Sequence, residues 1–183
     1  MAKTVLISIR PEWVEKIANG EKTIEVRKTQ PKLEAPFKCY IYCTNARPFL
    51  VWGDVFRSDW FTEFTRLSGY NKTEADSIWD VFNGHVAGEF TCNRVDVIRA
   101  ATEPYGIYDV DDDFVAQTRL VDGALWDYGK GATLYGWHIS KLEIYDTPKP
   151  LSKFKGLRKT KFGYAPVEIK RPPQSWCYVE ELK

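Results

Sequence analysis

Hydrophobic and polar positions follow strand and helix periods over most of the chain, and together they predict an α+β protein. Residues 4–9 form a β-branched run typical of a strand. Pro11 then suits the first turn of a short helix in which Trp13 and Ile17 recur at helical spacing, and Asn19-Gly20 is its stop signal. Further elements are expected as strands at residues 37–44, 85–100 and 135–145 and at the end of the stretch 172–179, and as helices at residues 73–82 and 109–120.

The segment from residue 23 to residue 27 alternates between polar and apolar side chains. A strand here places Thr23, Glu25 and Arg27 on one face and Ile24 and Val26 on the other. The apolar face is expected to pack on the core. The other face then offers three polar side chains together, which makes this segment the first candidate for a functional site.

The order of these elements favours one domain over residues 1–183, built as a small mixed β-barrel with short flanking helices. Residues 45–84 are interpreted as an insertion with a helical segment, and residues 149–183 as a basic C-terminal extension. The chain contains no G-x-G-x-x-G, P-loop, H-E-x-x-H or G-x-S-x-G motif, so several common enzyme classes lack support.

Charge and hydropathy narrow the choice of partners. With 26 basic and 25 acidic residues the net charge is +1, so any contact with nucleic acid must be local. The basic residues of the extension are either a solvated loop or a strip that contacts phosphate. The apolar run at the N-terminus is too short for a signal peptide, and no stretch approaches the roughly 18 apolar residues of a membrane span, so we expect a cytoplasmic protein without membrane contact.

The cysteines and acidic clusters do not predict a metal site. Cys39, Cys43, Cys92 and Cys177 lack a second pair at zinc spacing and are interpreted as reduced core thiols. Asp111, Asp112 and Asp113 lack the spaced ligands of a calcium loop and are typical of a helix start. We therefore expect no metal and no cofactor.

The side chains best suited to catalysis or to binding a charged ligand are those of Lys22, Glu25 and Arg27. Their candidate partner is Glu89 on a later strand. Lys22 and Glu25 are three residues apart and would lie on opposite faces of a regular strand, so Lys22 must leave from the turn if the two converge. A structural cluster of ion pairs at the strand ends is the alternative interpretation.

The pattern Gly20-x-Lys22-Thr23-x-Glu25-x-Arg27, with a strand and helix before it and Cys39-Tyr40-Ile41-Tyr42 after it, resembles the ASCH domain of the PUA-like superfamily. Gly88-Glu89-Phe90 and the stretch from Tyr135 to Ile139 resemble later strands of that domain. The resemblance covers about residues 4–44, 85–100 and 135–150. It implies a PUA-like barrel with a cleft beside the motif that binds RNA or nucleotides.

Some proteins of this family are hydrolases, acting on acetylated cytidine or on RNA. In the first group the resemblance places Lys22 and Glu89 on catalytic positions, but a threonine nucleophile stands where this chain has Glu25. A carboxylate can activate water and cannot form the ester intermediate of a threonine. This departure argues against the same mechanism.

Three functions follow. The first is an ASCH domain that binds RNA, a nucleotide or a modified nucleoside, with Arg27, Thr23 and Ser175 at the ligand and Trp137 or Trp176 stacking on it. The second is a hydrolase at the same cleft, with Lys22, Glu25 and Glu89 as catalytic residues. The third is an interaction protein, of phage or mobile-element type, that engages a protein partner through the aromatic insertion around Trp52 and Trp60.

Overall fold

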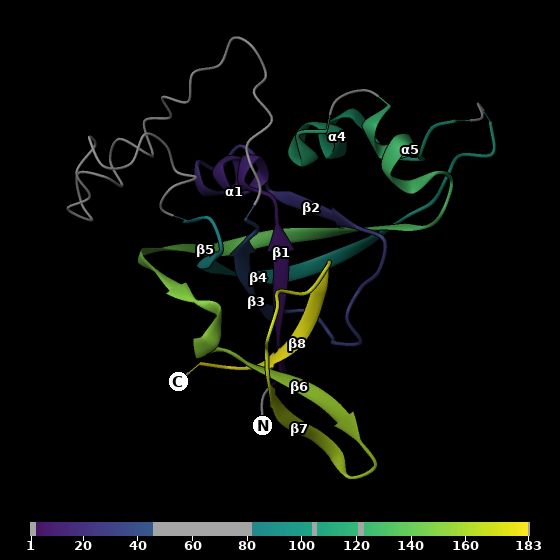
Figure 1. Cartoon of the computed structure of the whole chain (residues 1–183). Helices are drawn as coiled ribbons and strands as arrows, with labels where there is room; N and C mark the ends of the chain where they lie inside the picture. The colour runs from purple at the N-terminus through teal and green to yellow at the C-terminus, as the bar shows by residue number, and fades with distance from the viewer. Residues whose placement is uncertain (1–2, 46–81, 104–105, 121–122, 183) are drawn as a thin grey trace, which may run out of the picture.

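The computed structural model of the chain describes residues 3–45, 82–103, 106–120 and 123–182. Eight strands and three short helices are found there (Figure 1). In chain order they are β1 (Lys3–Ile9), α1 (Pro11–Ala18), β2 (Ile24–Arg27), β3 (Phe37–Cys43), β4 (His85–Ile98), α4 (Asp112–Thr118), α5 (Ala124–Gly129), β5 (Leu134–Pro150), a 3-10 turn (Leu151–Lys153), β6 (Lys155–Thr160), β7 (Gly163–Glu168) and β8 (Trp176–Glu180).

All eight strands belong to one mixed sheet in the order β2-β5-β4-β3-β1-β8-β6-β7. Strands β1 and β3 are parallel, and the other described neighbours are antiparallel. The predicted α+β class and mixed sheet are confirmed, but the predicted closed barrel is wrong. The sheet stays open because β2 pairs with β5 alone and β7 with β6 alone, so the two edge strands do not meet.

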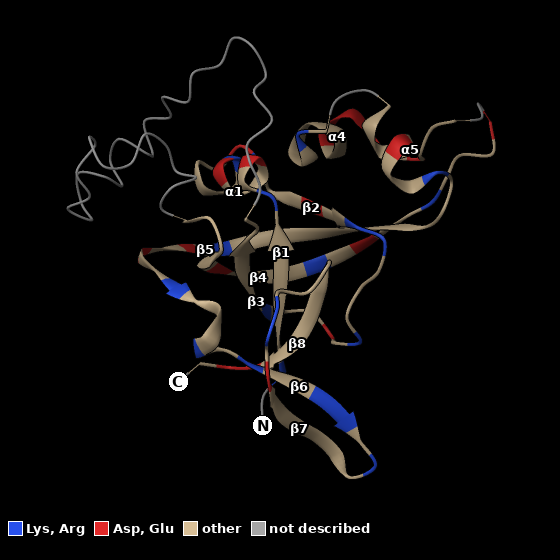
Figure 2. Cartoon of the chain, in the orientation of Figure 1, with Lys and Arg blue, Asp and Glu red and all other residues tan. Residues whose placement is uncertain are grey.

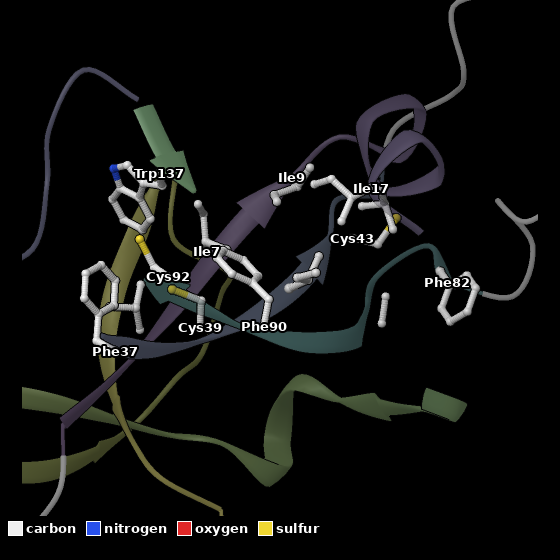
Figure 3. Close-up of a cluster of buried hydrophobic side chains, with 14 residues drawn as sticks. Ile7, Ile9, Ile17, Phe37, Cys39, Cys43, Phe82, Phe90, Cys92 and Trp137 are labelled. Carbon is white, nitrogen blue, oxygen red and sulfur yellow. The ribbon is translucent and has the colours of Figure 1, made fainter. Parts of the chain in front are cut away.

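The largest core cluster lies between α1 and the middle of the sheet (Figure 3). Val14 and Ile17 of α1 are buried against Ile7 and Ile9 of β1. At the other end of this cluster Trp137 of β5 is fully buried. The opposite face of the sheet has its own cluster, which includes residues of β1, β3, β4, β5 and β8.

Helices α4 and α5 cover β2 from the side that α1 leaves free. Ile24 and Val26 of β2 pack in one cluster with Phe114 of α4 and Leu125 of α5. Residues of β2 are therefore buried on both faces, and Glu25 is buried as well. The polar face expected for this strand is present, but it is enclosed by other elements and does not face solvent.

Two of the three described helices, α1 and α4, were predicted from the sequence, and the third, α5, was not. Helix α1 ends at Ala18, with Asn19 as its C-cap and Gly20 at a positive φ of 79°. Helix α4 begins where Asp111 accepts a hydrogen bond from the backbone N–H of Phe114. Helix α5 was not expected, since six residues carry too little periodic signal. No described helix has the length and apolarity needed to cross a membrane.

The largest difference from the predicted elements lies in the basic extension. Residues expected as loops form the β6–β7 hairpin, which lies at the opposite end of the molecule from the helices (Figure 1). Backbone pairing with a neighbour, and not an apolar alternation, makes these residues strands. The predicted insertion helix at residues 73–82 falls almost entirely outside the described residues.

The two longest strands, β4 and β5, lie in close contact at Gly88. A Cβ atom at this position would collide with the backbone carbonyl of Glu143 and lie 3.0 Å from the Cα atom of Ile144. We expect Gly88→Ala to lower the free energy of unfolding by about 1–3 kcal/mol in urea titrations, because backbone atoms cannot yield as side chains do. Gly156→Ala is the control, since its methyl would meet side-chain carbons of Ile169 and Val167 at 3.2–3.3 Å and lie 3.6 Å from the backbone carbonyl of Val167, an ordinary contact. Equal losses would contradict this account of the strand contact.

Candidate functional site

The residues before β2 are clamped between two helices. The backbone N–H of Lys22 donates to the carbonyl of Lys16 in α1 at 2.8 Å, and that of Thr23 donates to the carbonyl of Gln117 in α4 at 3.0 Å. The left-handed backbone of Gly20 permits the reversal that brings the chain back along α1. The side chain of Lys22 thus leaves from the turn, as the spacing to Glu25 requires.

The ammonium group of Lys22 is enclosed by three different partners. Its Nζ donates to the carbonyl of Thr118 at 2.6 Å, lies 3.4 Å from Oε2 of Glu25 and is 5.0 Å from the ring centre of Trp13. The side chain is only 3% exposed. Burial lowers the pKa of Lys22, and the carboxylate of Glu25 opposes that shift. The cation is therefore held by a helix-end carbonyl, a carboxylate and an aromatic face.

Glu25 links this lysine to an arginine on the same strand. Its Oε1 lies 3.0 Å from Nη2 of Arg27, and the same Nη2 donates to the backbone carbonyl of Ser8 in β1 at 2.6 Å. Both carboxylate oxygens thus face cations. The three charged side chains form one buried row that connects α4, β2 and β1.

This row lines a cavity of about 490 Å³, which lies within the usual range of roughly 300–1,000 Å³ for small-molecule sites. Three cationic side chains and a single carboxylate face it, together with two aromatic rings and several hydroxyl and amide groups. The lining residues are Ser8, Arg10, Trp13, Lys22, Glu25, Val26, Arg27, Thr44, Leu120, Tyr128, Gln174 and Ser175. We call it the primary cavity. The excess of cationic groups favours an anionic ligand.

Two polar atoms of lining residues are buried without a hydrogen-bond partner in the described part of the chain. They are Nε of Arg27, a donor, and Oγ1 of Thr44, which can donate or accept. A buried polar group without a partner costs about 1–3 kcal/mol.

Four of the predicted site residues meet at this cavity, and four do not. Lys22, Glu25, Arg27 and Ser175 line it. Thr23 lies beside it and donates its hydroxyl to Oε1 of Gln117 at 3.2 Å. The remaining three predicted residues, Glu89, Trp137 and Trp176, belong to other contacts.

Glu89 lies in a separate polar cluster and not beside Lys22. Its Oε1 pairs with Nζ of Lys38 at 2.8 Å, and its Oε2 accepts a hydrogen bond from the hydroxyl of Tyr145 at 2.5 Å. In register, Glu89 pairs with Tyr40, whose side chain belongs to the core cluster on the opposite face of the sheet from α1. The predicted partnership of Glu89 with Lys22 is therefore not observed.

The two predicted stacking residues are both used inside the protein. Trp137 is 0% exposed and packs edge-on against Phe37, with ring centres 5.8 Å apart, so its ring is not accessible to a ligand (Figure 3). Trp176 packs against Trp137 and donates its Nε1–H to Oγ1 of Thr29 at 3.0 Å. The aromatic rings that line the primary cavity belong to Trp13 and Tyr128.

The residues that sequence reasoning missed come from distant parts of the chain. Trp13 lies on the helix before the motif and was predicted as one of its apolar residues at helical spacing, so sequence reasoning assigned it to the core and not to the site. Tyr128 on the unexpected α5 and Gln174 before β8 carried no signal in the sequence. Within the described residues, no group of three or more His, Cys, Asp or Glu side chains is arranged to hold a metal ion.

The ionisation of Glu89 offers a test of its structural role. Burial by itself would raise the pKa of Glu89, but hydrogen bonds from Lys38 and Tyr145 outweigh burial and lower it. The resulting stabilisation is present above the unfolded value of 4.5 and is lost as the pH falls through the lowered folded value. We expect Glu89→Gln to be about 1 kcal/mol less stable than the unchanged protein at pH 7, with a difference that shrinks below pH 4.

Denaturant titrations between pH 3 and pH 7 measure this difference. Glu143→Gln is the matched control, because Glu143 lies opposite Glu89 in register and is exposed, with no ion pair in the described residues. A deficit of Glu89→Gln that stays constant over the pH range would show that its charge is not what stabilises the fold.

The comparison with known proteins addresses the fold. No protein-family model matches the sequence, and no curated protein matches it. The crystal structure of an ASCH protein from Zymomonas mobilis is similar with a TM-score of 0.51 at 16% identity, over 97% of this chain and 88% of that chain. A tyrosine-to-phenylalanine variant of that protein gives a TM-score of 0.50 at 16% identity, over 98% and 92%. At this identity the likeness concerns the fold alone, and this chain has the fold of an ASCH domain.

Proposed function

We propose that the primary cavity binds a nucleotide, either free or as part of an RNA. The observation that carries the proposal is a pair of buried polar atoms, Nε of Arg27 and Oγ1 of Thr44, that have no partner in the described part of the chain. Both belong to residues that line a cavity whose cationic groups outnumber its single carboxylate. Phosphate and base carbonyl oxygens are acceptors that suit a guanidinium N–H and a hydroxyl.

The surroundings of these two atoms suit the rest of a nucleotide. Trp13 and Tyr128 offer aromatic surfaces for a base, and the side chains of Gln174 and Ser175 offer donors and acceptors for its edge or for ribose hydroxyls. The fold shared with an ASCH protein supports this direction, since that family resemblance implies a ligand cleft beside the motif. Arg27 is the residue that we expect to contact the anionic group directly.

The contacts of the carboxylates favour binding over hydrolysis. A general base needs a free oxygen directed at a water molecule, whereas both oxygens of Glu25 face Lys22 and Arg27. Glu89 is engaged with Lys38 and Tyr145 away from the cavity. The alternative of an interaction protein rests on the aromatic insertion, which lies outside the described residues, and it stays a prediction.

Thr44→Val separates a binding role from a structural one. The substitution keeps the shape of the side chain and removes a buried hydroxyl that has no partner among the described residues. We expect the free protein to gain about 1 kcal/mol in stability, while affinity for nucleoside monophosphates falls about 3- to 10-fold. Thermal denaturation and titration calorimetry with the four nucleoside 5′-monophosphates measure the two effects.

Thr160→Val is the matched control for this substitution. The hydroxyl of Thr160 donates to the carbonyl of Gly163 within the β6–β7 hairpin, so its removal is expected to lower stability and leave binding unchanged. If Thr44→Val lowers stability and binds nucleotides as well as the unchanged protein, the hydroxyl has a structural partner and the proposal loses its support. Absence of nucleotide binding in the unchanged protein would overturn it outright.

A further inference from the structure

A second cavity, of about 580 Å³, lies where the chain leaves β2. The loop after this strand forms most of its lining, and Tyr135 of β5 completes it. The lining residues are Lys28, Thr29, Gln30, Pro31, Lys32, Leu33, Glu34 and Tyr135. No predicted site residue belongs to this group.

The two cavities meet at the end of β2. Arg27 lines the primary cavity and Lys28, the next residue, lines the second one. Nζ of Lys28 lies 4.9 Å from the ring centre of Tyr128, which lines the primary cavity. Arg27 also pairs in register with Tyr135, which lines the second. The Lys28–Tyr128 pair therefore lies at the boundary between the cavities. Figure 2 shows that basic residues continue from the end of β2 into the loop.

The loop that forms the second cavity is held in place by β8. Nε1 of Trp176 donates to Oγ1 of Thr29 at 3.0 Å, and the hydroxyl of Tyr178 accepts from the backbone N–H of Lys32 at 2.7 Å. Strand β8 directly follows Ser175, which lines the primary cavity. Strand β8 thus holds the loop of the second cavity, and the residue before it lines the primary cavity.

The charges of the second cavity match those of the first. Lys28 and Lys32 are exposed and form no ion pair with any described residue, and Glu34 is the single acidic group of the lining. Tyr135 adds an aromatic ring. Cations and rings therefore continue from Arg27 and Tyr128 to Lys32 and Tyr135, a combination that binds single-stranded nucleic acid by contacts with phosphates and stacking on bases.

We propose that the ligand is a single-stranded nucleic acid, which occupies both cavities at once. This inference rests on the proposed nucleotide-binding function of the primary cavity. One nucleotide enters the primary cavity, Lys28 contacts the phosphate that follows, and the next base lies in the second cavity beside Tyr135. Bases must be unpaired to enter either cavity, so a duplex of the same sequence does not bind in this way.

The test is a length series of single-stranded RNA. Fluorescence competition at several salt concentrations compares a mononucleotide with two-, four- and eight-nucleotide strands, with the matching DNA strand and with an RNA duplex. We expect affinity to rise at least tenfold from the mononucleotide to the four-nucleotide strand. Lys28→Gln is expected to lose about 3- to 10-fold of the four-nucleotide affinity and about 0.7 of the salt slope, and to keep mononucleotide affinity within twofold.

Lys32→Gln is a second variant with the same expectation, and Lys141→Gln, an exposed lysine of β5 that lines neither cavity, is the control. Equal affinity for mononucleotide and strand, both reduced in Thr44→Val, would overturn this inference and leave the primary site intact. Failure of every nucleotide and strand to bind would instead refute the proposed function. Tighter binding to the duplex than to the single strand would also contradict the inference. Equal binding of the RNA and DNA strands would support it and show that the protein contacts phosphates and bases and not the ribose 2′-hydroxyl.

Discussion

The buried carboxylate of Glu25 is the contact on which the arrangement of the site depends. It accepts from Lys22 through one oxygen and from Arg27 through the other. Each cation then reaches a backbone carbonyl on a different element, Thr118 at the end of α4 and Ser8 in β1. If the carboxylate were lost, two buried cations would face each other without compensation, and the positions of both would change.

A buried row of charges of this kind contributes little net stability to a fold. Buried ion pairs lose about as much solvation as they gain in attraction, and apolar side chains of similar size often stabilise a protein equally well. Here the row ends in a guanidinium whose Nε has no partner in the described chain, beside a cavity that also contains the unpartnered hydroxyl of Thr44. We infer that the charges are arranged for a ligand, because one carboxylate between two cations leaves a net positive charge there.

The local part of this site was predictable from the sequence, and the long-range part was not. The stop signal Asn19-Gly20 and the three-residue spacing of Lys22 and Glu25 indicated correctly that the lysine leaves from a turn. The sequence also predicted the α+β class and the strands around the motif. Alternation alone indicated that Glu25 faces outward. Helices contributed by residues 11–18, 112–118 and 124–129 enclose it, and no local pattern reports that enclosure.

Strand register and strand order determine where the other predicted site residues lie. Glu89 was paired with Lys22 by family resemblance, yet the sheet order places β5 between β2 and β4 and directs Glu89 to Lys38 and Tyr145. Trp137 pairs in register with Glu25, but its ring packs into the core. Tyr128 and Gln174 reach the cavity from the α5 and pre-β8 segments, about 100 and 150 residues after the motif, so only the tertiary fold brings them there.

A crystal structure of the protein soaked with nucleoside monophosphates tests the central claim most directly. The account predicts a phosphate or base oxygen within hydrogen-bond distance of Nε of Arg27 and of Oγ1 of Thr44, with the contacts of Glu25 to both cations retained. Density for the nucleotide only outside the primary cavity, or none at millimolar concentration in crystals whose cavity is open to solvent, would contradict it.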